Sequence, residues 1–411
     1  MVFRRMAWLM VLPLSLLAQQ ATLVRVSDVR PYFKGTGAPP AAWPQIAFDD
    51  STWSKSVGGF STGQWYNENT VLADMPGHYL SLFCRSRFTV SDPKSVNWLT
   101  LRIDYDDGIL AYLNGIEVAR RGFASGASVT YDTPAALLGR TWGEEIDLTA
   151  FTNVLVTGDN VLAIELHNSS LSDPTTALVA ELVANFTRGP FVQNVSSNRA
   201  QVVWKTPLPA DTKLAFGTSS ALENVILDTN LVTTHVVTLT NLSPQSVVFY
   251  RATSSQGNQA VAGAIESFRT LKTSGPVSFM VFGDSGMGSL GQFQIAEVIR
   301  RASPDLVLHV GDIMYSSLDV RGADMKCLSV YQPHMKSTPY FFVFGNHDLY
   351  SGTGIFSRRS TCQPIRLPAR SIFIRSTTGT FISRRFSFRC ARKTRCSRII
   401  TWVMTRSNTG G

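Results

Sequence analysis

The stretch VSFMVFGDSGMGSLGQFQIAEVIRRASPDLVLHVGDIMY, residues 277–315, decides the fold of the C-terminal part of this 411-residue chain. Its apolar runs 279–282 and 306–310 are typical of short buried strands, and each is followed by Gly-Asp. Between these runs, apolar residues recur at helical spacing over 292–302, which predicts the crossover helix of a parallel βαβ unit. The stretch therefore predicts the beginning of an α/β domain.

Polar side chains follow three apolar runs in this part of the chain. Asp284 follows the first, Asp312 and Tyr315 follow the second, and Asn346 and His347 follow a third run at 340–344. The carboxyl ends of parallel strands meet at one edge of a sheet, so we expect these side chains to come together. Carboxylate, phenol and amide oxygens are hard donors that suit iron, manganese, zinc or magnesium. The sequence therefore predicts a site with two metal ions that cleaves phosphate esters.

These three segments resemble the metal-binding motifs of the calcineurin-like metallophosphoesterases. Gly286 after Asp284, and Tyr315 after Asp312, are similar to the purple acid phosphatase pattern Asp-x-Gly, Gly-Asp-x-x-Tyr and Gly-Asn-His-Asp/Glu. The resemblance covers residues 275–350 and is specific there. It implies a metallophosphoesterase domain, assigned to residues 275–356, that hydrolyses phosphomonoesters in the manner of an acid phosphatase.

The resemblance also implies a role for each site residue. Asp284 and Tyr315 would bind a first metal ion, Fe³⁺, and Asp312 would bridge both ions. Asn346 would bind the second ion, a divalent Fe, Zn or Mn, through its side-chain oxygen. His347 would be the catalytic residue, placed beside the phosphate as a transition-state donor or as the acid for the leaving group.

Two neighbouring residues are expected to serve orientation and packing. Asp348 is expected to orient His347 rather than to bind metal, and His309, inside a predicted strand, is expected to be a packed core histidine. The family site also takes three later histidines, from Val-x-x-His and Gly-His-x-His segments, but none of the six histidines follows His347. The α/β domain is therefore predicted to be incomplete, and we expect weak or absent activity of this chain.

The segment 351–411 differs in composition from the rest of the chain. It contains twelve arginines, one lysine and no acidic residue, and without them 25 basic residues face 29 acidic ones. The formal net charge of +9 thus becomes −4, and three of the five cysteines also lie in this segment. Its apolar residues show no sustained period of 2 or 3.6, so no strand or helix is predicted.

We interpret residues 357–411 as a disordered basic tail produced by a slipped reading frame after about Gly354. Codons permitted for residues 376–383, read one base earlier, give Phe-Asp-Tyr-Gly-Asn-Val-His-Phe, which is similar to a purple acid phosphatase segment. A genuine basic arm for nucleic acid is the alternative. Cys, Ile and Phe scattered among the charges argue against such an arm, so we expect no nucleic-acid partner.

The N-terminus is typical of a secretory signal peptide, assigned to residues 1–20. Arg4 and Arg5 precede an apolar run at 7–17, and cleavage is expected within residues 18–21. The run is too short for a spanning helix, although an uncleaved anchor is the alternative. We expect a secreted or periplasmic protein with no membrane span after signal cleavage.

Residues 22–186 are expected to form a first β-sandwich. Apolar runs at 99–103 and 109–113 flank Asp106-Asp107-Gly108, and Asn114-Gly115 predicts a hairpin. Together with residues 48–53, this stretch resembles the galactose-binding-like modules of many secreted hydrolases. The resemblance implies a glycan partner, with a plain spacer role as the equal alternative.

Residues 188–272 are expected to form a second sandwich that resembles a fibronectin type III-like domain. The run 201–204 reads as an early strand with a buried Trp204, and 247–251 reads as a later strand. The sequence as a whole predicts a multidomain chain of two β-sandwiches followed by an incomplete α/β metallophosphoesterase domain. The predicted function is a secreted metal-dependent phosphoesterase. The alternative is a non-catalytic secreted protein that binds a glycan or partner and carries a vestigial phosphatase domain.

Overall fold

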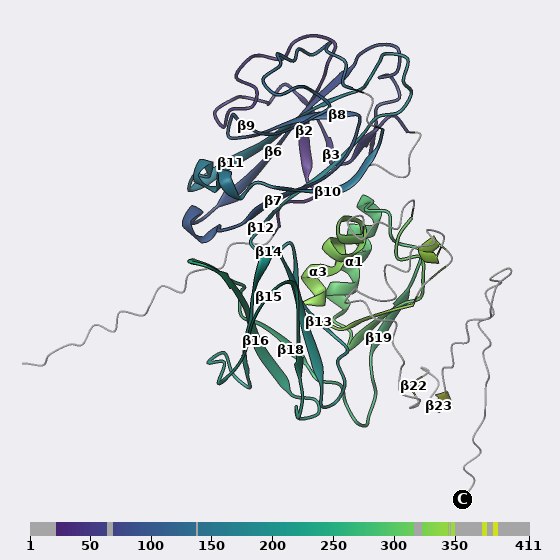
Figure 1. Ribbon diagram of the computed structural model, residues 1–411. Coiled ribbons are helices and arrows are strands. Elements are labelled where there is room, and N and C mark those ends of the chain that lie inside the picture. Colours follow the sequence, from purple (N-terminus) through teal and green to yellow (C-terminus); the bar gives the residue numbers. More distant parts are fainter. Residues whose placement is uncertain are drawn as a thin grey trace, which may run out of the picture.

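The computed structural model describes residues 22–63, 69–136, 139–315, 323–343, 345, 347–349, 372–375 and 381–384. Two β-rich units and a smaller α/β unit follow one another along this part of the chain (Figure 1). In Figure 1 the first β unit lies at the top, and the second β unit and the α/β unit lie beneath it. The predicted signal peptide lies outside the described residues.

The first unit is a sandwich of two antiparallel-rich sheets that share one apolar core. Leu101 and Leu182 of one sheet and Leu82 and Ile164 of the other belong to the same buried cluster. One sheet contains β1 (Thr22–Val24), β4 (Phe60–Ser61), β5 (Thr70–Val71), β7 (Leu99–Asp106), β10 (Thr141–Asp147) and β12 (Ala177–Ala184). The other contains β2 (Val29–Lys34), β3 (Ser54–Val57), β6 (Ser81–Val90), β8 (Gly108–Leu113), β9 (Ile116–Arg121) and β11 (Gly158–His167).

The hairpin predicted at Asn114-Gly115 joins β8 to β9. Both residues have positive φ, 52° and 89°, which is what a two-residue hairpin turn of this kind requires. Asp106-Asp107-Gly108 is not a hairpin turn, because β7 and β8 lie in different sheets. That segment therefore carries the chain from one sheet of the sandwich to the other.

The second unit is a single hydrogen-bonded sheet that wraps around its core. The first part of the long strand β14 pairs with β13 and its last part pairs with β16, while β15 follows it along both parts. Trp204 and Tyr250 are fully buried inside, so the predicted burial of Trp204 is confirmed. The strands are β13 (Arg188–Gln193), β14 (Ala200–Gly217), β15 (Asn224–Leu239), β16 (Val247–Gln256), β17 (Gln259–Ala262) and β18 (Glu266–Arg269).

The α/β unit contains a parallel sheet in the order β19 (Phe279–Phe282), β20 (Leu306–His309) and β21 (Tyr340–Phe342). The predicted crossover helix is α1 (Leu290–Ala302), which begins after Ser289, whose side chain accepts from the backbone N–H of Gln292. A second helical segment, the π-helical turn η3 (Asp324–Leu328) with α3 (Ser329–Met335), was not predicted. The remaining helical turns are η1 (Pro93–Ser95), η2 (Thr149–Val154) and η4 (His347–Leu349).

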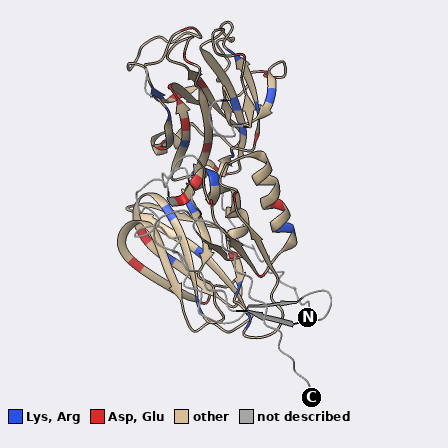
Figure 2. Cartoon of the chain, turned by 90° about the vertical axis from the view of Figure 1, so that its right-hand side faces the viewer, with Lys and Arg blue, Asp and Glu red and all other residues tan. Residues whose placement is uncertain are grey.

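The α/β unit packs against both β units. Phe191 and Val203 of the second unit share a buried cluster with Ile299 and Tyr331. Charged residues also lie at these contacts, and Figure 2 shows blue and red residues side by side where the upper unit meets the parts below it. The α/β unit is therefore held by two β surfaces. Within the described residues, no helix is long and apolar enough to cross a membrane.

The segment after residue 350 differs from the sequence-based expectation of no strand. The described residues there form β22 (Ile372–Arg375) and β23 (Phe381–Arg384), which pair in antiparallel fashion. The other residues of 351–411 lie outside the described part of the chain.

Candidate metal centre

Tyr315 joins two carboxylates at the carboxyl ends of neighbouring strands. Its hydroxyl donates to Asp284 Oδ1 at 3.0 Å and to Asp312 Oδ2 at 3.2 Å. Asp284 lies on the loop after β19 and Asp312 on the loop after β20, and these strands are parallel neighbours. Three oxygen donors from two adjacent strand ends therefore meet at one edge of the sheet. Their predicted role as metal ligands stays a prediction.

Both aspartates lie in the left-handed backbone region. Asp284 has φ 56° and Asp312 has φ 52°. Asp enters this region more readily than most residues, but the conformation still costs free energy and has to be held by the surroundings. Here the backbone N–H of Asp284 donates to the carbonyl of Gly311 at 3.0 Å, which ties the two loops together.

Glycines allow the loops to approach one another closely. A Cβ on Gly286 would lie 1.9 Å from the Ile313 carbonyl oxygen, and a Cβ on Gly345 would lie 2.0 Å from Asp312 Oδ1. Neither position therefore has room for a side chain. Gly286 belongs to the segment that resembles the purple acid phosphatase motif Asp-x-Gly. Its backbone carbonyl also accepts a hydrogen bond from the Tyr315 backbone N–H at 3.0 Å.

Asp348 holds the loops through their backbones. Its carboxylate accepts from the N–H groups of Ile313 (3.1 Å), Met314 (3.1 Å) and Gly345 (2.8 Å). Burial raises the pKa of Asp348, and these three hydrogen bonds oppose that rise. The sequence predicted that Asp348 orients His347. That role stays a prediction, and the described contacts also make Asp348 the acceptor that ties the second loop to the third.

His309 is fully buried, so the prediction of a packed core histidine is confirmed. Its ring lies 4.8 Å from the Phe282 ring, and burial lowers its pKa to about 4. Its Nε2 lies 2.8 Å from Ser285 Oγ, which also accepts from the Tyr331 hydroxyl at 2.9 Å. The sequence analysis missed Ser285 and Tyr331. Ser285 lies inside the Asp-x-Gly motif, at the position that the motif leaves open.

His347 lies at the open side of this cluster. It is exposed, its ring lies 4.7 Å from the ring of Tyr315, and its backbone N–H donates to Asp312 Oδ1 at 3.1 Å. Asn346, the predicted ligand of the second metal ion, lies outside the described residues. Four of the five predicted site residues are thus described, and they are neighbours in space.

The charges at this site favour a cation. Burial, followed by the hydrogen bond to Asp284 and the charge of Asp312, raises the pKa of Tyr315, because an anionic phenolate would face two carboxylates. A cation would remove this penalty, so the donor set of two carboxylates and a phenol fits a hard metal ion. In the described residues, however, no group of three or more His, Cys, Asp and Glu residues could hold a metal ion. The described donors therefore amount to part of a metal site.

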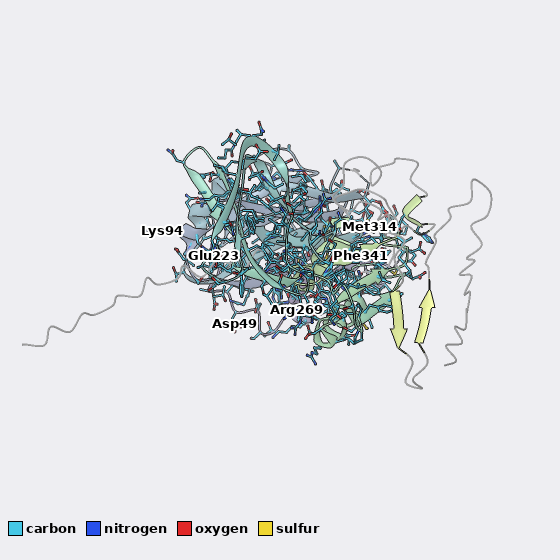
Figure 3. All side chains as sticks on the ribbon, turned by 90° about the horizontal axis from the view of Figure 1, so that it is seen from below. Asp49, Lys94, Glu223, Arg269, Met314 and Phe341 are labelled. Atoms are coloured by element: carbon cyan, nitrogen blue, oxygen red, sulfur yellow. The ribbon has the colours of Figure 1, made fainter. Side chains whose placement is uncertain are left out.

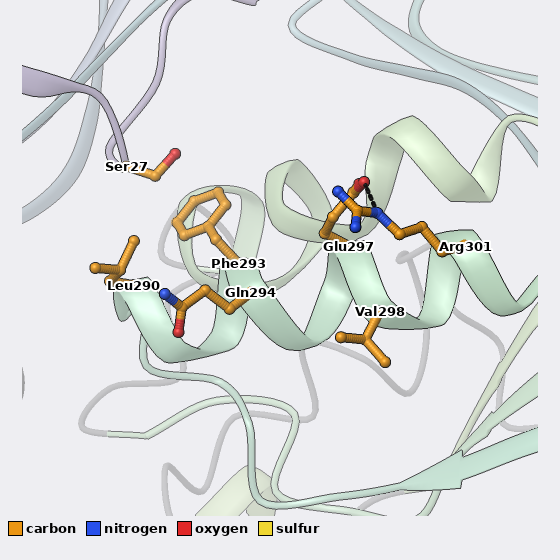
Figure 4. A pocket seen from close by; sticks show the side chains of 7 residues that line it. All are labelled: Ser27, Leu290, Phe293, Gln294, Glu297, Val298 and Arg301. Carbon is orange, nitrogen blue, oxygen red and sulfur yellow. Dashed lines mark hydrogen bonds and ion pairs between the residues drawn. The ribbon is translucent and has the colours of Figure 1, made fainter.

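A groove of about 410 Å³ lies elsewhere, on the outer side of α1 (Figure 4). Leu290, Phe293 and Val298 line it together with the ion pair of Glu297 and Arg301, and Ser27 of the first unit lies opposite. None of the candidate site residues lines this groove. Figure 3 shows Met314 and Phe341, next to the candidate site, on the side of the molecule away from Lys94 and Glu223.

Two comparisons bear on the class of protein. Residues 277–390 match the family model for calcineurin-like phosphoesterases. Purple acid phosphatase 15 of Arabidopsis thaliana is 28% identical over 141 residues, which cover 28% of this chain and 26% of that protein. Residues 277–390 are therefore similar to the calcineurin-like phosphoesterases, and this similarity implies a dinuclear metal centre in general. The aligned part spans about a quarter of the length of the plant relative.

Solved structures of glycoside hydrolases are similar over a larger part of the chain. A glycosyl hydrolase family 2 member from Bacteroides cellulosilyticus has a TM-score of 0.33 and 12% identity, covering 80% of this chain and 52% of its own. A β-glucuronidase from Bifidobacterium dentium has a TM-score of 0.34 and 9% identity, and the match covers 79% of this chain and 61% of the β-glucuronidase chain. Both TM-scores lie below 0.5, so neither similarity carries an argument about fold or function.

The family match also bears on the reading-frame hypothesis. It extends to residue 390, well beyond the point after Gly354 where the frame was predicted to slip. The match therefore lends no support to an out-of-frame segment that begins there. The frame slip stays a prediction about the gene.

Proposed function

We propose that the chain is a metal-dependent phosphoesterase of the acid phosphatase type, which hydrolyses phosphomonoesters at a dinuclear centre of Fe³⁺ and a divalent Fe, Zn or Mn ion. The observation that carries the proposal is the meeting of Asp284, Asp312 and the Tyr315 hydroxyl within hydrogen-bond distance. The family match supports the reaction class. Among the described residues the ligand set is incomplete, which supports the expectation that this chain turns over slowly or not at all.

Each residue has a task in this proposal. Asp284 and Tyr315 would hold the ferric ion, Asp312 would be a ligand of both ions, and Asn346 would hold the divalent ion. His347, exposed at the open side, donates a hydrogen bond or proton to the phosphate ester. The chemistry that two bound cations supply is stabilisation of charge on the attacking and leaving oxygens of an in-line displacement.

Metal binding by the full chain tests the proposal independently of turnover. The purified protein, stripped of metal and then titrated with Fe³⁺ and Zn²⁺, is expected to bind both and to gain visible absorption from Tyr315. Tyr315→Phe should lose the absorption, and Asp312→Asn should lose metal. Asp228→Asn, an exposed change in β15, is the matched control and should alter neither. Absence of stoichiometric metal in the unaltered chain overturns the proposal.

The alternative is a non-catalytic protein that binds a glycan or partner through its β units and carries a vestigial phosphatase domain. It is favoured by the absence, among the described residues, of a group of three His, Cys, Asp or Glu residues suited to metal. Retention on a polysaccharide column without bound metal is the expected result for this alternative. Under either function we propose export, as a secreted or periplasmic protein, on the basis of residues 1–20.

A further inference from the structure

A chain of hydrogen bonds runs from the core of the α/β unit to the loop that carries Asp284. The Tyr331 hydroxyl on α3 donates to Ser285 Oγ at 2.9 Å, and Ser285 Oγ lies 2.8 Å from His309 Nε2 on β20. Tyr331 and His309 are fully buried. Three elements of the unit, namely the β19 loop, β20 and α3, are thus joined at one serine hydroxyl.

The Ser285 hydroxyl bonds to both buried side chains at once. Its oxygen accepts from the Tyr331 hydroxyl, and it lies within hydrogen-bond distance of His309 Nε2, with the direction of that bond set by the imidazole tautomer. His309 Nδ1 is buried and has no hydrogen-bond partner in the described part of the structure. The bond to Ser285 is therefore the one hydrogen bond of the His309 ring among the described residues.

Ser285 is the residue through which these hydrogen bonds act on Asp284. Its side chain is fixed to the core, and its backbone N–H donates to the carbonyl of Asp312 at 3.3 Å. The peptide plane between residues 284 and 285 is held from two sides as a result. Asp284 itself has φ 56°, a conformation that needs such support.

We infer that Tyr331, acting through Ser285 and together with His309, is a positioning residue that holds Asp284 in its left-handed conformation with its carboxylate toward Tyr315 and Asp312. The inference rests on the proposed function in that Asp284 is a metal ligand. Outer partners of this kind set the orientation of a metal ligand, and their loss usually lowers metal affinity about 10–100-fold.

Tyr331→Phe in the full chain tests the inference, with Tyr340→Phe as the matched control. The Tyr340 hydroxyl is bonded to His334 Nδ1 at 3.0 Å, and its ring lies 5.5 Å from that of Tyr331 in the same core. We expect Tyr331→Phe to weaken Fe³⁺ binding about tenfold or more and to speed hydrogen exchange at the Ser285 amide in the metal-free protein. Tyr340→Phe should leave both within twofold of the unaltered chain. Equal effects of the two changes overturn the inference.

A double-mutant cycle adds a second arm that loss of packing would not reproduce. Ser285→Ala removes the hydroxyl through which the same hydrogen bonds run. The double variant Tyr331→Phe/Ser285→Ala should therefore bind Fe³⁺ no more weakly than either single variant. Additive losses would show that the two residues act separately, against the inference. If Tyr331→Phe does not fold, Ser285→Ala carries both readouts alone. If the unaltered chain binds no metal, the proposed function fails, while the exchange measurement still decides whether Tyr331 holds the Asp284 loop.

Discussion

Arg188 of the second β unit and Asp324 of the α/β unit form a bidentate ion pair that is buried between the two units. Arg188 Nη2 lies 2.7 Å from Asp324 Oδ2, and Nε binds the other carboxylate oxygen. Burial alone would raise the pKa of Asp324, but the charges of Arg188 and Arg102 lower it below its ordinary value. The carboxylate is therefore ionised at neutral pH, and its position depends on the arginine.

Arg188→Met should destabilise the protein by about 3–5 kcal/mol, because it leaves the buried Asp324 charge without its main partner. Urea denaturation at pH 7 measures the change. Glu297→Gln is the control: Glu297 pairs with Arg300 and Arg301 on the exposed face of α1, where solvent screens the charges. A loss in Arg188→Met no larger than the control's would mean that the pair does not hold the units together.

Glu181 should make the stability depend on pH. It is fully buried in the first β unit, where it accepts from Ser329 Oγ at 3.0 Å and lies 3.7 Å from Arg102 Nη1. Burial raises its pKa from 4.5 to about 7, although Arg102 acts in the opposite direction. A group whose pKa is raised on folding stabilises the protein fully below its unfolded pKa. That stability is lost as pH rises through the folded pKa.

Ionisation of Glu181 should therefore lower the free energy of unfolding by about 3 kcal/mol between pH 4.5 and pH 7. Above pH 7 its contribution should no longer change. Glu181→Gln cannot ionise and should lack this component. Urea denaturation of both proteins at several pH values measures it. Curves that stay parallel across this range would rule out the raised pKa.

The strands and helix that position the candidate site could be predicted because their sequences are simple. The apolar runs 279–282, 306–310 and 340–344 correspond to β19, β20 and β21, and 292–302 corresponds to α1. The apolar residues of α1 recur at helical spacing, which predicted the helix although Ile295 and Val298 are 50% and 57% exposed. These elements place Asp284, Asp312 and Tyr315 where the motifs suggested.

The segment η3–α3 could not be predicted, because its apolar residues do not recur at a clear helical spacing in these surroundings. It is buried between two β units, and polar residues such as Asp324, Gln332 and His334 are buried as well. Pro333 lies inside α3, which argues against a helix in any sequence-based analysis. The contacts of Tyr331 and the backbone contacts of Asp348 were not predicted for a related reason. They act through a serine hydroxyl and through backbone N–H groups, which leave no pattern in the sequence.

Asp348→Ala should loosen the Asp312 loop, because it leaves the N–H groups of Ile313, Met314 and Gly345 without their acceptor. Each buried donor that loses its partner costs about 1–3 kcal/mol. Hydrogen exchange at these three amides should become faster than in the unaltered chain. Asp305→Ala is a suitable comparison, since Asp305 accepts from Ser278 N–H at the other end of the sheet. Unchanged exchange at Ile313 and Met314 would contradict the assigned role.

The outer edge of β15 should make the protein prone to self-association. In the described structure β15 pairs only with β14, and it contains neither Lys nor Pro, the residues that usually guard an edge strand. Leu227 and Leu231 are 58% and 59% exposed on it. Leu227→Lys/Leu231→Lys should therefore reduce light scattering in concentrated solution. Exposed substitutions of this kind change the free energy of unfolding little, so the melting temperature should stay the same.

Leu171→Lys is the matched control for this prediction. Leu171 is 46% exposed but lies in a loop, where no unpaired strand edge accompanies the apolar side chain. If apolar exposure alone caused the association, Leu171→Lys would reduce light scattering in proportion to the exposed apolar area that it removes. Because an edge strand offers a row of free N–H and C=O groups as well, the double change in β15 should have the larger effect per residue. Equal effects at both places would assign the association to general apolar surface rather than to β15.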